Sequence, residues 1–309
     1  MPIYNAKKDM SVAIESVLAQ TYKELELILV DDGSNDGSSE ICDEYERKDS
    51  RVKVLHQQNS GCAAARNSAL KVVQGDYISF VDSDDVVHPK TYEILIKNLE
   101  NYEADISICD YKEFSNALPT EYVEDNRIEI LNNEEAIKEL NENAKFTLAL
   151  WSKVYKKELF YNEEFPLIKT SSDNFIAYRL LYKSRKIVYC SNQYYYYKVN
   201  PLSVTHKKGY VNMHILYEGI KIVEYIKEKM PSQYVSTAYK YMLLSLGIYN
   251  TMIINNVHDT EKVHEVYRKV KEWNQIVGNT IPMPRKKRYQ LNLFLFNRKL
   301  YKLMYRLII

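Results

Sequence analysis

Short apolar segments that end in acidic residues alternate with helical segments through the first third of this 309-residue chain. Residues 25–30 and 77–81 have the length and apolar character of buried strands, and a cluster of aspartates follows each of them. Strands that alternate with helices predict a mostly parallel sheet with helices on both faces. Ligands of such sheets bind beyond the carboxyl ends of the strands, which is where both aspartate clusters fall.

Hydrophobic periodicity sets the boundaries of the other expected elements. Further strands are expected over 52–55, 105–109, 187–190 and 194–199. Helices are expected over 10–20, 38–47, 62–73, 89–101, 151–160, 173–183, 209–229, 232–255 and 259–276. The chain should therefore contain an α/β domain over 1–205, made of halves 1–105 and 106–205, and then a C-terminal helical region over 206–309.

The first strand of this sheet is incomplete in the sequence pattern. Residues 1–5 have the character of a junction between a strand and the loop that follows it. Because a parallel sheet that is buried on both faces should not stop there, we expect an apolar strand on the N-terminal side of Met1. Either a start codon assigned too late or a trimmed chain would produce this pattern, and a methionine at the first position favours the late start.

The charge of the chain is polarised, although its net value is only +1. Residues 1–105 carry 20 acidic and 11 basic side chains, a net charge of −9, whereas 273–309 carry eight basic side chains and no acidic one. This distribution argues against nucleic-acid binding, because the predicted ligand-binding half is acidic. A hydrophobic content of 46% excludes a disordered chain. No apolar run reaches the length of about 18 residues that a membrane-spanning helix needs.

The four cysteines lie far apart in the sequence and form no CxxC pair. Their spacing suggests neither a disulfide framework nor a zinc site. A reducing, cytoplasmic compartment is therefore expected. The 28 tyrosines, together with many asparagines and lysines, are typical of a protein from an AT-rich bacterial genome.

The sequence Asp-Ser-Asp-Asp at 82–85 places three carboxylates close together at the end of a predicted strand. Their mutual repulsion has to be compensated by a cation or by hydrogen bonds. Hard oxygen ligands of this kind suit Mn²⁺ or Mg²⁺, which retain water molecules and bind substrate phosphates. A solvated acidic turn that caps the next helix is the alternative interpretation.

Several short motifs occur in a fixed order along the chain: Pro-Ile-Tyr-Asn at 2–5, Asp-Asp-Gly-Ser at 31–34, Ala-Arg-Asn at 65–67, Asp-Ser-Asp-Asp at 82–85, Trp-Ser-Lys-Val-Tyr-Lys at 151–156, four tyrosines at 194–197 and Ser-Val-Thr at 203–205. This ordered set resembles the family 2 glycosyltransferases, the inverting nucleotide-sugar enzymes of GT-A fold. Each motif is weak alone, but the ordered set is specific and covers 1–205. The resemblance implies a Rossmann-like GT-A domain and a role in bacterial polysaccharide or other glycan synthesis.

The resemblance implies roles for residues that would bind the nucleotide-sugar donor, which by family habit would be a uridine diphosphate sugar. Pro2 and Tyr4 would flank the nucleotide base. Asp31 or Asp32 would accept a hydrogen bond from the base, and the choice between them is open. Arg66 would approach the diphosphate.

The second aspartate cluster would hold the sugar and the metal ion. The resemblance implies that Asp82 and Ser83 frame the donor sugar, that Asp84 is the direct ligand of Mn²⁺ or Mg²⁺, and that Asp82 shares this ion. His206 would complete the metal shell, as a histidine does in some GT-A enzymes; the alternative is an exposed loop histidine. Asp85 is expected on the acceptor side.

Asp173 is the candidate catalytic base that the resemblance implies. The family has a Glu-Asp pair at the start of a helix, and this chain has Ser-Ser-Asp-Asn at 171–174, so the aspartate is present and the glutamate is absent. Asp173 would take the proton of an acceptor hydroxyl that attacks the anomeric carbon and inverts it. Alternatively, Asp173 only caps the helix. Trp151 would stack on an acceptor sugar, or it belongs to the core.

Two other functions are compatible with parts of the sequence. A phosphatase of the haloacid dehalogenase type would use Asp82 as nucleophile and Asp84 as acid, but its motif normally lies on the first strand of the domain. A non-catalytic scaffold would bind a nucleotide sugar without transferring it, and the missing glutamate favours that view.

The segment 285–309 has the pattern of a basic amphipathic helix. The apolar residues Phe296, Leu300, Leu303, Met304 and Leu307 form one stripe, opposite Arg298, Lys299, Lys302 and Arg306. Such a helix can bind an anionic membrane and would hold the protein at the inner face of the plasma membrane, near a glycan or lipid-linked acceptor. The alternatives are docking on its own domain and self-association with another subunit.

Overall fold

The computed structural model describes residues 1–115, 117–119, 125, 127–168, 172–199, 211–257 and 259–308. The chain forms two compact units. The first unit consists of Met1–Ala136 and Phe146–Asn200, and the second of Ile137–Lys145 and Pro201–Ile309. The segment 137–145 of the second unit lies within the range 1–205 that the sequence analysis assigns to the first domain, and the expected domain boundaries stay a prediction.

A three-stranded parallel sheet carries the first aspartate cluster. Its strands are β1 (Pro2–Ile3), β2 (Leu27–Asp31) and β3 (Val52–His56), and the helices between them are α1 (Met10–Leu18) and α2 (Ser38–Lys48), with α3 (Cys62–Leu70) following β3. All five residues of β2 are buried, as its continuous apolar run predicts. Helix α1 buries residues at helical spacing, so each element uses the periodicity seen in the sequence.

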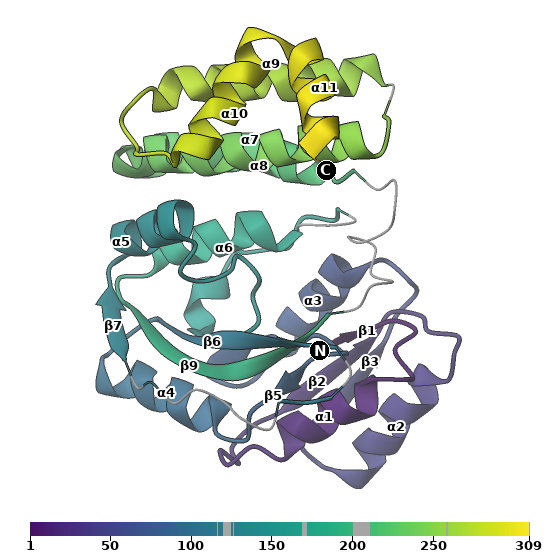
Figure 1. The fold of residues 1–309 in the computed structure, drawn as a ribbon. Coiled ribbons are helices and arrows are strands. Elements are labelled where there is room, and N and C mark those ends of the chain that lie inside the picture. The colour runs from purple at the N-terminus through teal and green to yellow at the C-terminus, as the bar shows by residue number, and fades with distance from the viewer. Residues whose placement is uncertain are drawn as a thin grey trace. The chain divides into compact units, whose positions relative to one another are not determined.

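A mixed sheet with the order β4-β8-β6-β9-β5 carries the second aspartate cluster, and β7 pairs with β9. Its strands are β4 (Tyr77–Ser79), β5 (Val86–Val87), β6 (Ile106–Phe114), β7 (Ile128–Leu131), β8 (Lys153–Lys156) and β9 (Ile187–Lys198). The helices of this part are α4 (Thr91–Asn101), α5 (Asn133–Lys138) and α6 (Ser172–Lys183). In Figure 1, α1, α2 and α4 lie on one side of the strands of the first unit, and α3 and α6 lie on the other.

The helix predicted over 151–160 is wrong. Residues Lys153–Lys156 form strand β8, which pairs antiparallel with both β4 and β6, and only the short 3-10 helix η2 (Lys157–Phe160) follows it. The two strands predicted over 187–190 and 194–199 are one strand, β9, which runs parallel to β6. The periodicity of a short apolar run does not distinguish a strand from a helix. Here the segment forms a strand because it pairs with β4 on one side and β6 on the other.

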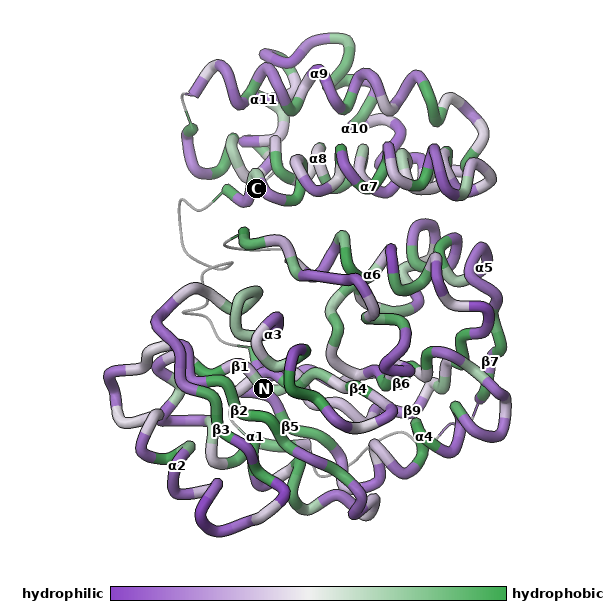
Figure 2. Tube along the Cα trace, turned by 180° about the vertical axis from the view of Figure 1, so that it is seen from behind, coloured by the Kyte–Doolittle hydropathy of each residue, from purple (hydrophilic) through white to green (hydrophobic). Residues whose placement is uncertain are grey.

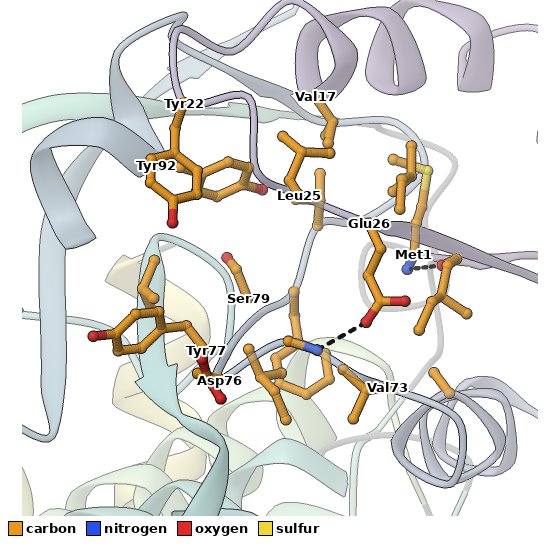
Figure 3. Close-up of a pocket in the computed structure, with 18 of the residues that line it drawn as sticks. Met1, Val17, Tyr22, Leu25, Glu26, Val73, Asp76, Tyr77, Ser79 and Tyr92 are labelled. Atoms are coloured by element: carbon orange, nitrogen blue, oxygen red, sulfur yellow. Dashed lines mark hydrogen bonds between the residues drawn. The ribbon is translucent and has the colours of Figure 1, made fainter. Parts of the chain in front are cut away.

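An apolar cavity of about 330 Å³ lies beside the start of β2 and along β4 (Figure 3). Its lining includes Val17, Leu25, Tyr77 and Tyr92, and Met1 lies at its edge. Met1 and Ile28 both line the cavity, and the α-amino group of Met1 donates a hydrogen bond of 2.8 Å to the carbonyl of Ile28. This bond continues the pairing of β1 with β2 up to the cavity. The strand expected on the N-terminal side of Met1 stays a prediction.

The second unit is helical. Its elements are α7 (His214–Lys229), the 3-10 helix η4 (Pro231–Gln233), α8 (Tyr234–Ile254), α9 (Thr260–Val277), α10 (Arg285–Phe296) and α11 (Arg298–Ile308). The hydropathy alternates along these helices, which is the pattern of amphipathic packing (Figure 2). Helices α7 and α8 approach closely at Gly219, where a Cβ atom would clash with the ring of Tyr241. Among the helices of the described residues, none is long and apolar enough to cross a bilayer.

A π-helical turn, η1 (Glu139–Asn143), joins this helical unit from the middle of the sequence. The amide of Asn141 donates hydrogen bonds to Ser236 Oγ at 3.2 Å and Thr237 Oγ1 at 3.0 Å on α8. All three residues are buried. The turn is therefore part of the helical core.

Candidate active site

The aspartate at the end of β2 is saturated with hydrogen-bond donors. The backbone N–H of Ser34 and the ring Nδ1 of His56 each lie 3.0 Å from a carboxylate oxygen of Asp31, which is buried. Burial opposes the ionisation of this group, but the hydrogen bonds from Ser34 and His56 outweigh it and lower the pKa of Asp31. Asp31 is thus an ionised anchor for the loop that follows β2.

The next aspartate ties β2 to the start of α3. Asp32 accepts hydrogen bonds from the backbone N–H groups of Ser60, at 2.9 Å, and Gly61, at 2.7 Å, and from the side chain of Gln57 at 2.7 Å. Gly61 has a φ of +91°, which a residue with a side chain rarely adopts. The Asp-Asp pair therefore positions α3, and the sequence prediction that one of these aspartates binds the base stays a prediction.

The loop after β1 lies against the loop after β2. The backbone N–H of Asn5 donates to Ser34 Oγ at 3.0 Å, and the N–H of Asn35 donates to the Asn5 side chain at 2.9 Å. The ring of Tyr4 is 53% exposed, and Pro2 is half-buried. Hydrogen bonds thus hold the backbones of the two loops together, and the ring of Tyr4 is exposed to solvent. An exposed ring at this place is what the expected contact with the nucleotide base requires.

The second aspartate cluster is poorly compensated. Asp82, Ser83 and Asp84 are half-buried, and Asp85 is completely buried. Burial first and the charge of Asp82 second raise the pKa of Asp84. The same two causes raise the pKa of Asp85 to about 8. Crowded carboxylates of this kind favour a cation, because a positive charge removes their repulsion.

Two residues expected on the acceptor side, Asp85 and Trp151, are buried. Asp85 is 0% exposed, and its carboxylate accepts hydrogen bonds from Tyr195 Oη at 2.6 Å and from the N–H of Lys198 at 2.8 Å. Trp151 is buried and stacks on Tyr195 and Tyr197 with ring centroids 4.7 and 5.4 Å apart. Both residues thus attach β9, and their expected contact with the acceptor stays a prediction.

Arg66 links the two halves of the first unit. It lies one turn into α3, is 6% exposed, and its guanidinium pairs with Asp82 at 3.1 Å and with Asp173. The guanidinium carbon also lies 5.9 Å from the ring of Phe80 and 5.6 Å from that of Phe165. The expected contact of Arg66 with a diphosphate stays a prediction, and its two carboxylate partners could not be read from the sequence.

Asp173 lies in the first turn of α6 and reaches the second aspartate cluster through this arginine. Burial raises its pKa, and the charge of Arg66 opposes that rise. The hydroxyl of Ser172 also donates to it at 3.3 Å. An aspartate with a raised pKa, held near the metal candidates, has the chemistry of a general base.

The described residues contain no group of three or more His, Cys, Asp or Glu side chains that could by themselves hold a metal ion. Asp82 and Asp84 offer two carboxylates, and the third expected ligand, His206, lies outside the described residues. Magnesium-type ions are commonly held by one or two carboxylates together with substrate phosphates and water. The two aspartates therefore fit a metal that binds together with a diphosphate.

Tyr195 and Lys198 are site-supporting residues that the sequence analysis did not single out. Both lie on β9 and hold Asp85, and Tyr195 also lies 3.4 Å from the backbone nitrogen of Asp82. The tyrosine-rich run 194–197 was the available signal, but it gave no indication of which hydroxyl faces the aspartates.

Residues 1–169 match the sequence profile of "Glycosyl transferase family 2". The chain belongs to this family. Among curated relatives, it is 37% identical to the glycosyltransferase GlyG of Streptococcus pneumoniae over 209 residues, which are 64% of this chain and 69% of GlyG. It is 32% identical to the glycosyltransferase GlyA of the same species over 231 residues, which are 71% of this chain but only 33% of GlyA. The chain thus spans a third of the length of GlyA.

Solved structures of similar fold include complexes with nucleotide sugars. S. aureus TarS 1-349 in complex with UDP-GlcNAc has a TM-score of 0.69 at 19% identity and covers 98% of this chain and 87% of its own. The mannosyltransferase PcManGT of Pyrobaculum calidifontis, in complex with GDP-Man and Mn²⁺, has a TM-score of 0.57 at 14% identity and covers 99% of this chain and 84% of its own. At these identities the likeness shows the fold alone, and it confirms the predicted GT-A class with a C-terminal helical region.

Proposed function

We propose that this family 2 glycosyltransferase moves a hexose or N-acetylhexosamine from a UDP-sugar to a hydroxyl group of a glycan, lipid-linked or protein-linked acceptor, with inversion at the anomeric carbon. The observation that carries the proposal is the bridge by Arg66 between Asp82 and Asp173. It brings the predicted donor-binding carboxylate and the predicted base into one site, although 91 residues separate them in the sequence.

The donor side of the proposed reaction uses the two aspartate clusters. Asp82 and Asp84 would hold Mn²⁺ or Mg²⁺ with His206, and Ser83 would contact the sugar. When bound, the ion neutralises the charge of the departing diphosphate. The exposed ring of Tyr4 would cover the base. The likeness to TarS, whose complex contains UDP-GlcNAc, supports uridine as the base.

The acceptor side depends on Asp173. Its carboxylate would accept the proton of the attacking hydroxyl while Arg66 holds it in position. A raised pKa makes Asp173 a stronger base than an ordinary exposed aspartate. Exclusion of water from the site would favour transfer of the sugar to the acceptor hydroxyl over hydrolysis of the donor. We place this reaction in the cytoplasm, and four unpaired cysteines support a reducing compartment.

The family assignment favours glycosyl transfer over the phosphatase interpretation. A scaffold that binds a nucleotide sugar without turnover remains the competing hypothesis, and the Ser-Asp pair at 172–173, in place of Glu-Asp, is the feature that favours it.

The test is a thermal-shift panel of UDP- and GDP-sugars with and without Mn²⁺, followed by transfer or slow hydrolysis of a radiolabelled donor. We expect UDP-sugars to stabilise the protein only with the ion, because ligand binding stabilises the folded state by mass action. Asp84→Asn should lose this shift, whereas the matched control Asp110→Asn, also half-buried with a raised pKa, should keep it. Binding without any turnover would establish the scaffold, and no binding of any nucleotide sugar would refute both.

A further inference from the structure

The last two helices of the second unit have one apolar face that is buried. Leu291 and Phe294 of α10 and Tyr301 of α11 are buried, and Tyr301 donates a hydrogen bond of 2.7 Å to Asn250 of α8. The rings of Phe294 and Tyr301 also pack on that of Tyr249. This face is what holds α10 and α11 to the helical unit, which the two helices cross in yellow in Figure 1.

A second apolar face of the same helices is exposed. Leu300, Leu303 and Leu307 of α11 are 40%, 58% and 79% exposed, and Phe296, at the end of α10, is 85% exposed. At 100° per residue, the three leucines fall within about 60° of one another around the helix. Docking of this stripe on the helices of its own unit is thus contradicted, because Tyr301 makes that contact instead.

Basic residues flank the exposed leucines in register. Lys299, Lys302 and Arg306 each precede one of these leucines by one position, so they lie along the same side of the stripe. Lys299 and Arg306 are exposed, as are Arg285, Lys286 and Lys287 of α10. Arg298 is different, because its guanidinium carbon lies 4.2 Å from the centre of the Tyr267 ring.

We propose that this surface binds an anionic lipid bilayer. We call it the tail face, and it consists of Phe296, Leu300, Leu303 and Leu307 with Lys299, Lys302 and Arg306. The leucines and the phenylalanine enter the boundary between headgroups and acyl chains, and the cations contact lipid phosphates. The proposal goes beyond sugar transfer and does not depend on it.

The charge of the tail face selects a membrane over a second copy of the chain. A symmetric contact would place each tail face against itself or its immediate surroundings. Residues 273–309 contain eight basic residues and no acidic one, so the cations of two copies would face one another without counter-charges. An anionic bilayer supplies both an apolar layer and the missing negative charge.

The experiment is flotation of the full chain with vesicles of phosphatidylcholine alone and of phosphatidylcholine mixed with phosphatidylglycerol. We expect binding to the anionic vesicles only, with a decrease as salt is added. The double variants Leu303→Gln/Leu307→Gln and Lys299→Glu/Lys302→Glu should each lower the partition coefficient at least about tenfold.

Control variants change exposed residues elsewhere in the chain. Ile254→Gln, at the end of α8, removes an apolar side chain that is 54% exposed, and Lys97→Glu/Lys271→Glu makes the same change of net charge as the tail-face variant. These controls should float like the original chain. Equal binding to neutral and anionic vesicles, no binding at low salt, or equal losses in the controls would overturn the proposal. A chain that is dimeric by light scattering, becomes monomeric in the leucine variant and never floats would assign the tail face to self-association.

Discussion

The two aspartate clusters at the strand ends look alike in sequence but are opposite in electrostatics. Asp31 and Asp32 receive backbone and side-chain N–H donors, and the pKa of Asp31 is lowered. Asp84 and Asp85, in the segment between β4 and β5, have raised pKa values because of their burial and the charge of a neighbouring carboxylate. Both clusters follow apolar strands, so the local sequence alone does not separate them.

The difference teaches which acidic cluster is available for a cation. Donors from the loop after β2, from β3 and from the loop after β3 already bind the carboxylates of the first cluster, so that it serves to hold loops together. In the second cluster, Asp82 shares Arg66 with Asp173, and no ion pair of Asp84 is found among the described residues. Uncompensated charge in a folded protein commonly marks a functional site rather than a structural one.

The largest expected effect comes from neutralising Asp84. In Asp84→Asn, transfer should fall by about a thousandfold or more, because charge stabilisation by a metal is worth several kcal/mol. Thermal stability should hold or rise, since one of the crowded carboxylates is removed. Initial rates with Mn²⁺ and melting curves with EDTA measure the two effects. Unchanged donor affinity in Mn²⁺ would show that Asp84 is not a metal ligand.

Asp173 should affect the chemical step and leave donor binding intact. We expect Asp173→Asn to lower transfer at least about a hundredfold, the usual lower worth of a general base. The measurement is single-turnover transfer together with donor affinity by calorimetry. Asparagine caps helices as well as aspartate does, so near-normal turnover would leave Asp173 with a capping role only.

The pH dependence of stability should differ in sign between the clusters. In the folded protein the pKa of Asp85 is about 8, above its unfolded value, so the folded state holds more protons between about pH 4 and pH 8 and loses stability as the pH rises through that range. In the wild-type chain the free energy of unfolding should fall by an amount on the order of a few kcal/mol over this pH range, and Asp85→Asn should remove that fall. Melting temperatures from pH 5 to pH 9 in EDTA measure it.

Asp31 provides the opposite case for that experiment. Its folded pKa is lowered, so its contribution to stability is present above the unfolded pKa and is lost as the pH falls through the folded value. Asp31→Asn should therefore destabilise the protein at neutral pH by about 1–3 kcal/mol and have little effect in strong acid. If the two variants changed stability in the same direction at every pH, the proposed electrostatic difference between the two clusters would be wrong.

The smallest expected effect concerns the cavity beside β2 and β4, the strands that carry the two clusters. Four alternating valines and isoleucines fused before Met1 should enter it and raise the melting temperature by roughly 2–4 °C or more, because they bury apolar surface and convert the buried amine of Met1 into a peptide N–H. That amine now has a pKa lowered to about 5, mainly by its burial. A Gly-Ser-Gly-Ser extension is the control, and equal melting temperatures would show that the added apolar side chains do not fill the cavity.

The sequence predicted what local periodicity and motif order encode. Helices α1 and α2 begin at the expected residues, and both aspartate clusters follow their strands. The strand β8 was mistaken for a helix, because only its neighbours β4 and β6 define it. The burial of the Asp85 side chain could not be predicted either. Neighbouring residues of a turn point in different directions, and only the folded structure shows that the carboxylate of Asp85 faces Tyr195.

The least predictable contact of the site is that between Arg66 and Asp173. The pair is 107 residues apart, and no local pattern relates an arginine on α3 to the first turn of α6. The motifs gave each residue a role separately. Their joint role depends on packing, which a single sequence does not display.

The π-helical turn within 137–145 makes the order of synthesis matter. Asn141 leaves the ribosome 95 and 96 residues before its partners Ser236 and Thr237. Until α8 follows, the buried side chains of Ile137 and Leu140 have no helical unit to enter. A nascent chain or a fragment that ends near residue 205 would therefore expose these apolar side chains, which chaperones bind. The helical unit expressed alone would lack part of its own core.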